Sequence, residues 1–229
     1  MYREHRCSEG LRPYVECYWS RGEAKAKTTR VVPDGCADIL FPEGKPPFVV
    51  GTMTRPLLVD GAASAPIIAV LFRPGGAYPF FSVPIRELTD VRADLGDVWR
   101  HPESVETLAD LDSVLLSRIS RVPKPDARIA EAVERIEETR GRVRVDRLSD
   151  ALGCSRQHMN RLFERHVGVG VKLFSRIVRL RSAIGRLPVA GWADFALDAG
   201  YCDQSHFISE CRALTGVTPL QLGSESSPG

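Results

Sequence analysis

The chain has 229 residues, of which 43% are hydrophobic and 26% are charged. These values exclude a disordered chain, and no segment approaches the roughly 18 consecutive apolar residues that a membrane helix needs. With typical domains of about 100 to 150 residues, the length favours two domains. The net charge of +2 is uneven, because residues 124–223 carry 16 basic and 12 acidic side chains and the rest is negative overall. This asymmetry is a modest indication of nucleic-acid binding.

The N-terminal end of the sequence is charged and leads into no apolar core of the kind that a secretion signal needs. We therefore expect a cytoplasmic protein that is associated with the nucleoid and not with a membrane. The six cysteines are dispersed and include no CxxC pair. This usage is typical of buried thiols in a reducing compartment rather than of disulfides.

Short apolar runs separated by proline and glycine clusters occupy the first part of the chain. They lie at residues 14–19, 39–41, 48–50, 57–59 and 67–72 and predict β-strands joined by tight turns. Residues 108–119 follow with helical spacing, and the pattern breaks at Pro123 and Pro125, which cannot continue a helix. We predict a β-rich sensor or dimerisation domain, barrel or cupin-like with flanking helices, over residues 1–122 and a linker over residues 123–127.

Beyond the linker the sequence predicts only helices. Apolar residues recur every three or four positions over residues 127–139, 145–152, 156–166 and 171–187. Ser155 is placed to cap the third helix, and Pro188 to end the fourth, which would be a rod of roughly 25 Å. The expected fold class is two-domain α+β, with an all-α domain at residues 128–223 and a flexible tail at residues 224–229.

One pattern occurs twice in the helical part. In each copy a short helix carries a small residue, Ser149 or Ala196, and ends at a glycine, Gly153 or Gly200; a turn and a capped helix follow. A helix-turn-helix needs a small residue where its helices cross and a glycine that can take a positive φ at the turn. The sequence therefore predicts two helix-turn-helix units joined by the long helix.

The residues of these units resemble the AraC/XylS family of bacterial transcription regulators. The strings are GYCDQSHF at 200–207 with GVTP at 216–219, LSDALGCSRQHMNRLF at 148–163, and RLRSA at 179–183. VPDGCADILF at 32–41 and FRPGGA at 72–77 resemble a sensor-like domain that precedes many such DNA-binding domains. The resemblance implies a DNA-binding transcription regulator without catalytic residues or cofactor, with RNA polymerase as a candidate partner.

The second unit departs from the family pattern. Cys211 stands where a core Phe is usual, Ser209 stands where Arg is frequent, and a Leu-Gly pair at residues 222–223 replaces a common Tyr-Arg pair. These differences suggest looser packing and a weaker grip on DNA. We therefore expect the first unit to do most of the sequence reading.

The candidate DNA-binding residues lie on the second helix of each unit, because the N-terminal half of that helix reaches base edges in a major groove. Arginine can bond guanine, and Asn or Gln can bond adenine, through two parallel hydrogen bonds. The alternative for each side chain is a solvated helix face. The candidates are Ser155, Arg156, Gln157, Asn160, Arg161 and Arg165 in the first unit, and Gln204, Ser205, His206 and Ser209 in the second. His206 is also suited to packing or backbone bonding, whereas Asp203 is expected to cap the helix.

Phosphate contacts, which position a protein without specifying sequence, are expected from Arg165, Lys172, Arg176 and Arg179. Two recognition helices in successive major grooves of one DNA face lie about 34 Å apart. A single chain would then read two adjacent elements, so the sequence permits a monomer as well as a homodimer.

Three roles are open for the N-terminal domain. A sensor for an unknown small-molecule effector would combine aromatic walls with a polar anchor, and its candidates are Trp19, Asp34, Cys36 and Arg73. The alternative is that these residues only form the core and a turn. A thiol or metal sensor would use Cys7, Cys17 and Cys36, although a tetrahedral zinc site needs convergent ligands and dispersed cysteines are weak evidence for one. An enzyme would need clustered histidines with a carboxylate or a four-cysteine zinc site, and the N-terminal region offers neither. Cys36 as a nucleophile has no candidate base nearby in the sequence, so no catalytic activity is expected.

Overall fold

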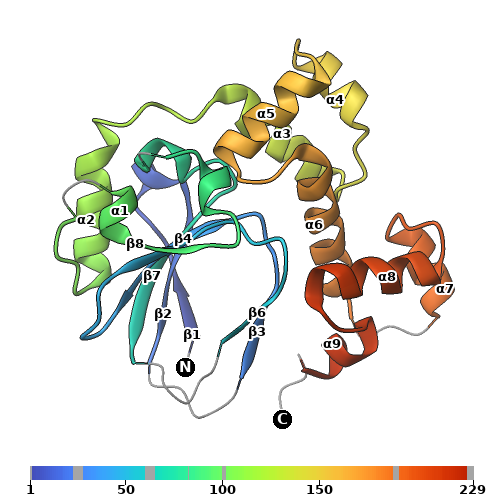
Figure 1. Cartoon of the computed structure of the whole chain (residues 1–229), viewed down its shortest axis with the longest axis horizontal. Helices are drawn as coiled ribbons and strands as arrows, with labels where there is room; N and C mark the ends of the chain where they lie inside the picture. Colours follow the sequence, from blue (N-terminus) through green and yellow to red (C-terminus); the bar gives the residue numbers. More distant parts are fainter. Residues whose placement is uncertain are drawn as a thin grey trace.

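The computed structural model describes residues 2–22, 28–59, 65–81, 83–99, 102–187 and 191–225. A β-sheet with helices packed against it forms the N-terminal domain, and helices alone form the C-terminal domain (Figure 1). This order confirms the expected fold class. Among the described residues, no helix is long and apolar enough to cross a membrane.

The main sheet has six antiparallel strands in the order β1-β2-β7-β4-β5-β8. They are β1 (Tyr2–His5), β2 (Val15–Arg21), β4 (Ala37–Pro42), β5 (Phe48–Val50), β7 (Ile67–Phe72) and β8 (Arg92–Asp94). A separate two-stranded ribbon consists of β3 (Thr29–Val31) and β6 (Leu57–Val59). Among the described strands, β1 and β8 are the edges of the main sheet, so it is open rather than closed into the barrel that the sequence suggested.

Five strands coincide with the predicted apolar runs. The sequence does not predict β1, β3 or β8, because these strands are three or four residues long and mostly exposed. No alternation between apolar and polar residues therefore marks them.

One face of the sheet carries the N-terminal core. Tyr18, Val70 and Ile39 are direct neighbours across β2, β7 and β4, and each is at most 2% exposed. Side chains alternate across a strand, so Trp19 and Asp38 point to the opposite face. The core face is covered by η1 (Glu9–Leu11), η3 (Tyr78–Phe80), η4 (Ile85–Leu88), α1 (Leu95–Val98) and α2 (Leu108–Ile119).

The C-terminal helices are α3 (Ala127–Glu138), α4 (Val145–Ala151), α5 (Arg156–His166), α6 (Val171–Ile184), α7 (Trp192–Asp198), α8 (Gln204–Thr215) and α9 (Pro219–Glu225). α3 begins at Ala127, where the helical pattern begins, although the predicted linker also included this residue. α9 includes two residues that the sequence assigned to the tail. Residues 226–229 lie outside the described part of the chain.

The long helix α6 is shorter than predicted. It ends at Ile184, and Gly185 follows, a residue that weakens a helix. The amides of Arg186 and Leu187 then bond to carbonyls three residues back, so the chain tightens into turns before it reaches the proline. Pro188 itself lies outside the described residues. The 14 residues of α6 correspond to roughly 21 Å.

Two hydrophobic clusters hold the helical domain together, and α6 contributes to both. Phe174 packs in the first cluster with Met159 and Phe163, whereas Ile177 packs in the second with Phe207. Cys211 and Leu222, the residues that depart from the family pattern, are both buried in the second cluster and so contribute to its packing.

Phe207→Ala should lower the free energy of unfolding by about 3–5 kcal/mol, because it opens a cavity in a fully buried site. Urea unfolding followed by circular dichroism measures this change. The control is Leu197→Ala on α7, whose side chain is 58% exposed and should change stability by less than about 0.5 kcal/mol. Equal effects of the two substitutions would contradict the packing described for the second unit.

Candidate nucleic-acid interface

The first helix-turn-helix unit is built as the sequence predicts. Gly153 takes a φ of +63° at the turn, and the Ser155 side chain accepts a hydrogen bond from the His158 amide at 3.2 Å, which caps α5. Met159 and Phe163 are fully buried on the inner face of α5. The helix is therefore held by its inner face and leaves the opposite face at the surface.

The outer face of α5 carries the main DNA-binding candidates. Arg156, Gln157 and Arg161 are all exposed. They line a hollow of about 620 Å³ together with Val145, Asn160, Val171 and Lys172. Three of the seven lining side chains are cationic and none is acidic. The hollow thus combines hydrogen-bonding side chains with positive charge, as contact with a nucleic-acid groove requires.

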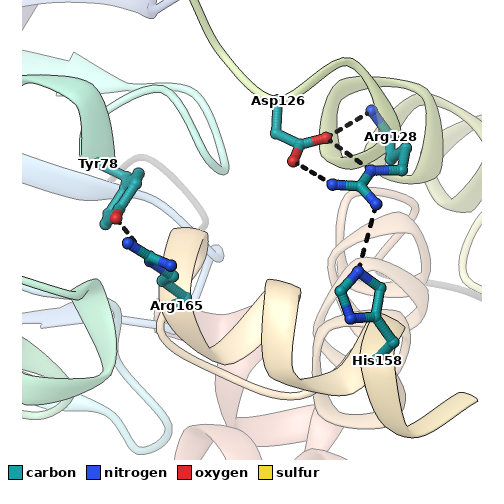
Figure 2. A network of polar contacts seen from close by, with 5 residues as sticks. All are labelled: Tyr78, Asp126, Arg128, His158 and Arg165. Atoms are coloured by element: carbon teal, nitrogen blue, oxygen red, sulfur yellow. Dashed lines mark hydrogen bonds and ion pairs between the residues drawn. The ribbon is translucent and has the colours of Figure 1, made fainter. Parts of the chain in front are cut away.

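Besides Ser155, two further candidates of the first unit have partners within the chain. The Asn160 amide donates to Glu164 Oε1 at 2.7 Å. Arg165 Nε donates to the Tyr78 hydroxyl at 2.5 Å, as Figure 2 shows, so this arginine bridges α5 and the N-terminal domain. In this structure Arg165 thus takes part in a contact between the domains, and its role in DNA binding stays a prediction.

A second polar network joins the start of α3 to α5. The Asp126 carboxylate accepts hydrogen bonds from the amide and the guanidinium of Arg128, and Arg128 Nη1 lies 3.2 Å from His158 Nε2 (Figure 2). Hydrogen bonds from Arg128 lower the pKa of the Asp126 carboxyl. The network ties the end of the predicted linker to the first turn of α5, next to the candidate base-reading residues.

In the second unit Asp203 caps α8, as expected, by accepting a hydrogen bond from the His206 amide at 2.7 Å. Gln204, Ser205 and Ser209 are exposed. The His206 ring instead accepts from the Cys202 amide at 3.3 Å and lies edge-on to Tyr201. His206 thus supports the turn, which is the alternative that the sequence left open for it.

Two arginines expected at phosphates join α6 to the second unit. Arg176 forms two hydrogen bonds with the Glu210 carboxylate, at 2.8 and 2.9 Å, and Arg179 donates to the Gly200 carbonyl at 3.2 Å. Helical spacing places both on a polar stripe of α6, but it cannot show that this stripe faces another helix. Of the α6 candidates, Lys172 is exposed and lines the hollow.

Arg144 and Arg147 were not among the predicted DNA-binding residues, and they lie one residue before and two residues after Val145, which lines the hollow. Both are exposed, and Arg144 pairs with Asp146 at 2.7 Å, which lowers the pKa of that carboxyl to about 2. The available signal was four arginines within residues 140–147.

The four predicted ligand residues have hydrogen-bond or ion-pair partners within the chain. Trp19 Nε1 donates to Asp38 at 3.0 Å, the Asp34 carboxylate accepts from the Cys36 amide at 2.9 Å, and Arg73 pairs with a glutamate. A cavity of about 1160 Å³ lies at the ends of β2 and β4 and the start of β7, and it is lined by none of the four. It is formed by strand ends and by residues 102–107, which are far apart in sequence.

Arg21 is the residue of this cavity that sequence reasoning missed. Its Nε is buried and has no hydrogen-bond partner in the part of the chain that the structure describes. Phe41, Ile67 and Ile68 contribute apolar wall. No local pattern marks Arg21, because its surroundings come from distant segments.

The cysteines of the N-terminal domain are poorly suited to thiol chemistry. Burial raises the pKa of the Cys7 and Cys36 thiols. It raises the pKa of the Cys17 thiol to about 11. A thiol with a raised pKa forms little of the reactive thiolate at neutral pH. Within the described ranges, no group of three His, Cys, Asp or Glu side chains could hold a metal ion.

Asp38→Asn should weaken the pH dependence of stability. Burial, with a smaller contribution from Asp34, raises the pKa of Asp38 from 3.8 to about 7, against the hydrogen bond from Trp19. The folded chain therefore keeps a proton that the unfolded chain loses, and this contribution to stability declines as the pH rises from about 4 to about 7. Urea unfolding at pH 5 and at pH 8 measures the free energy of unfolding at each pH. This free energy should fall less between pH 5 and pH 8 in the variant than in the wild type. An unchanged loss, equal to that of the exposed-site control Asp97→Asn, would refute this role of Asp38.

Sequence models of two families match the chain. Residues 148–224 match a helix-turn-helix domain, and residues 3–94 match a domain of unknown function. No curated protein matches the sequence.

Solved structures similar to this chain include the xylose-binding transcription activator xylR, at 22% identity and a TM-score of 0.41; that match covers 45% of this chain and only 28% of the activator. A structure of ToxT from Vibrio cholerae has 11% identity and a TM-score of 0.48, covering 89% of this chain and 97% of that one. ToxT with bound unsaturated fatty acid has 12% identity and a TM-score of 0.44, covering 93% and 96%. Residues 148–224 of this chain are therefore a helix-turn-helix domain, and they follow an N-terminal region whose residues 3–94 match a family without an assigned function.

Proposed function

We propose that this protein is a transcription regulator that binds double-stranded DNA at specific sequences and responds to a small molecule through its N-terminal domain. The observation that carries the proposal is that α5 has a buried apolar face and an exposed polar face. Its buried residues Met159 and Phe163 fix the helix, while Arg156, Gln157 and Arg161 are exposed on its outer face. A helix held in this way can enter a major groove without losing its own packing.

The side chains of the hollow suit two kinds of contact with DNA, to base edges and to phosphates. Arg156 and Arg161 suit two parallel hydrogen bonds to guanine, and Gln157 suits adenine. Lys172 at the start of α6 offers a charge to a phosphate, which positions the helix without specifying sequence. Asn160 contributes less, because its amide already bonds to Glu164.

The second unit supports the first with weaker contacts. Its exposed side chains Gln204, Ser205 and Ser209 are short or uncharged, so they offer fewer bidentate bonds to bases. Since one chain carries both units, a monomer suffices to contact two adjacent, non-palindromic elements. A homodimer and a contact with RNA polymerase stay compatible with this function.

Arg161→Ala should weaken binding to the preferred site by about 1–3 kcal/mol, which is roughly a 5- to 150-fold rise in Kd, and relax specificity at one base pair. The preferred site is first selected from a pool of random duplexes with the wild-type protein. Fluorescence anisotropy with that site and its single-base variants then gives the affinities. The control Arg12→Ala removes an exposed arginine of the N-terminal domain and should leave them unchanged.

The same titrations at several salt concentrations separate phosphate contacts from base contacts. Wild-type affinity should fall steeply as the salt concentration rises. Lys172→Ala should reduce the slope of log affinity against log salt concentration by about one, and it should weaken binding to all DNA sequences alike. An Arg161→Ala protein with unchanged affinity and specificity would exclude Arg161 as a base-reading residue. A flat salt response of the wild type would point to a protein-binding role.

We place the effector in the cavity beside Arg21. An apolar body would contact Phe41, Ile67 and Ile68, and a carboxylate would satisfy the buried Nε of Arg21. The thiol and metal alternative is less well supported, because the cysteine pKa values are raised.

A thermal-shift screen of the full chain against small carboxylic acids tests this site. A compound that stabilises the wild type should lose its effect in Arg21→Gln and keep it in Arg73→Gln, which changes the site predicted from sequence. The opposite pattern would move the effector to Arg73. Stabilisation by zinc or a response to thiol oxidants alone would favour the cysteine alternative.

A further inference from the structure

The N-terminal domain contacts the two helix-turn-helix units at equivalent points. Gly168 and Gly216 occupy corresponding positions in the two sequence repeats, and each precedes a valine. Gly216 directly follows α8, and Gly168 follows α5 after one residue, Val167. Both glycines lie against the N-terminal domain. In Figure 1 the β3–β6 ribbon lies on the side of the sheet domain that faces α8 and α9.

The first contact holds the end of α5. The Thr52 hydroxyl donates to the Val167 carbonyl, and the Thr89 hydroxyl donates to the Gly168 carbonyl at 2.7 Å. Gly168 has a φ of +95°, and a Cβ at this position would lie 2.9 Å from Ile85. The close approach of the two domains thus depends on the absence of a side chain.

The second contact holds the end of α8. Arg30 on β3 donates from Nη1 to the Thr215 carbonyl at 3.0 Å. Gly216 has a φ of +76°, and a Cβ there would lie 3.3 Å from Pro56, which immediately precedes β6. The contact therefore comes from the two-stranded ribbon, whereas the first contact comes from segments next to the main sheet.

The chemistry of the two contacts is the same. The last carbonyl groups of an α-helix have no partner within the helix and accept hydrogen bonds from outside it. The N-terminal domain supplies such donors to both recognition helices. It holds their C-terminal ends, so their N-terminal halves, which carry the candidate base-reading residues, are left for DNA.

We propose that Arg30, Thr52 and Thr89 are positioning residues for DNA recognition, which brace the ends of α5 and α8 and so fix the spacing of the two DNA elements that one chain reads. This inference rests on the proposed function. None of the three residues touches DNA, and each acts through the helix whose end it holds. A change in the relative position of ribbon and sheet would alter the preferred spacing.

The experiment measures spacing preference rather than affinity alone. From the selected site, duplexes are made with zero, one or two base pairs inserted between the two elements. Each insertion moves the second element by about 3.4 Å and rotates it around the DNA axis, because one turn holds about 10 base pairs. The wild type should lose at least about tenfold in affinity per insertion, if the recognition helices are held rigidly.

Arg30→Ala should reduce this penalty to within about threefold, while the affinity for a duplex that carries the first element alone stays unchanged. The double substitution Thr52→Val and Thr89→Val should act in the same direction, and Thr52→Ser with Thr89→Ser should restore the preference. The matched control is Arg92→Ala, which removes an arginine of the N-terminal domain that stacks on Phe48. If the threonine variant fails to fold, Arg30→Ala still decides the question.

The outcomes separate this inference from the proposed function. Folded variants that keep the wild-type spacing penalty would refute the positioning role of Arg30, Thr52 and Thr89, and they would not contradict DNA binding. Absence of DNA binding by the wild type would overturn the proposed function, and the positioning role with it. A loss of affinity that is equal at all spacings would show that the residues only stabilise the fold.

Discussion

The helical domain depends on the way α6 divides its apolar side chains between two cores. Phe174 and Ile177 are three residues apart, yet the first packs against Phe163 in one unit and the second belongs to the core of the other. Residues at this spacing lie on adjacent parts of a helix surface, so one helix can fill two cores. α6 therefore joins the two helix-turn-helix units through their cores.

Polar contacts also connect α6 to one of the two units. Arg176 and Arg179 connect α6 to the second unit, through Glu210 and the Gly200 carbonyl. Arg156 and Arg161, by contrast, lie at a surface hollow without an acidic side chain in its lining. Arginines of the same domain therefore serve different purposes, and the partner that each one meets decides which.

Several contacts between the two domains join a side chain of the N-terminal domain to a backbone carbonyl of the helical domain. Donors of the N-terminal domain reach the carbonyls at residues 167, 168 and 215, and Arg181 Nη1 donates in turn to the Asp34 carbonyl at 3.4 Å. Backbone carbonyls are present at every residue, so no sequence pattern marks those that are used. This explains why the connection between the domains could not be predicted.

The sequence by itself determined the elements whose cause is local. The repeated glycine and cap positions fixed both helix-turn-helix units, because a positive φ at Gly153 and Gly200 and the caps at Ser155 and Asp203 depend on residues a few positions apart. Only the tertiary structure decided the open sheet, the cavity beside Arg21 and the partners of the arginines. These features arise where distant segments meet, and hydrophobic periodicity shows which face of an element is buried but not what covers it.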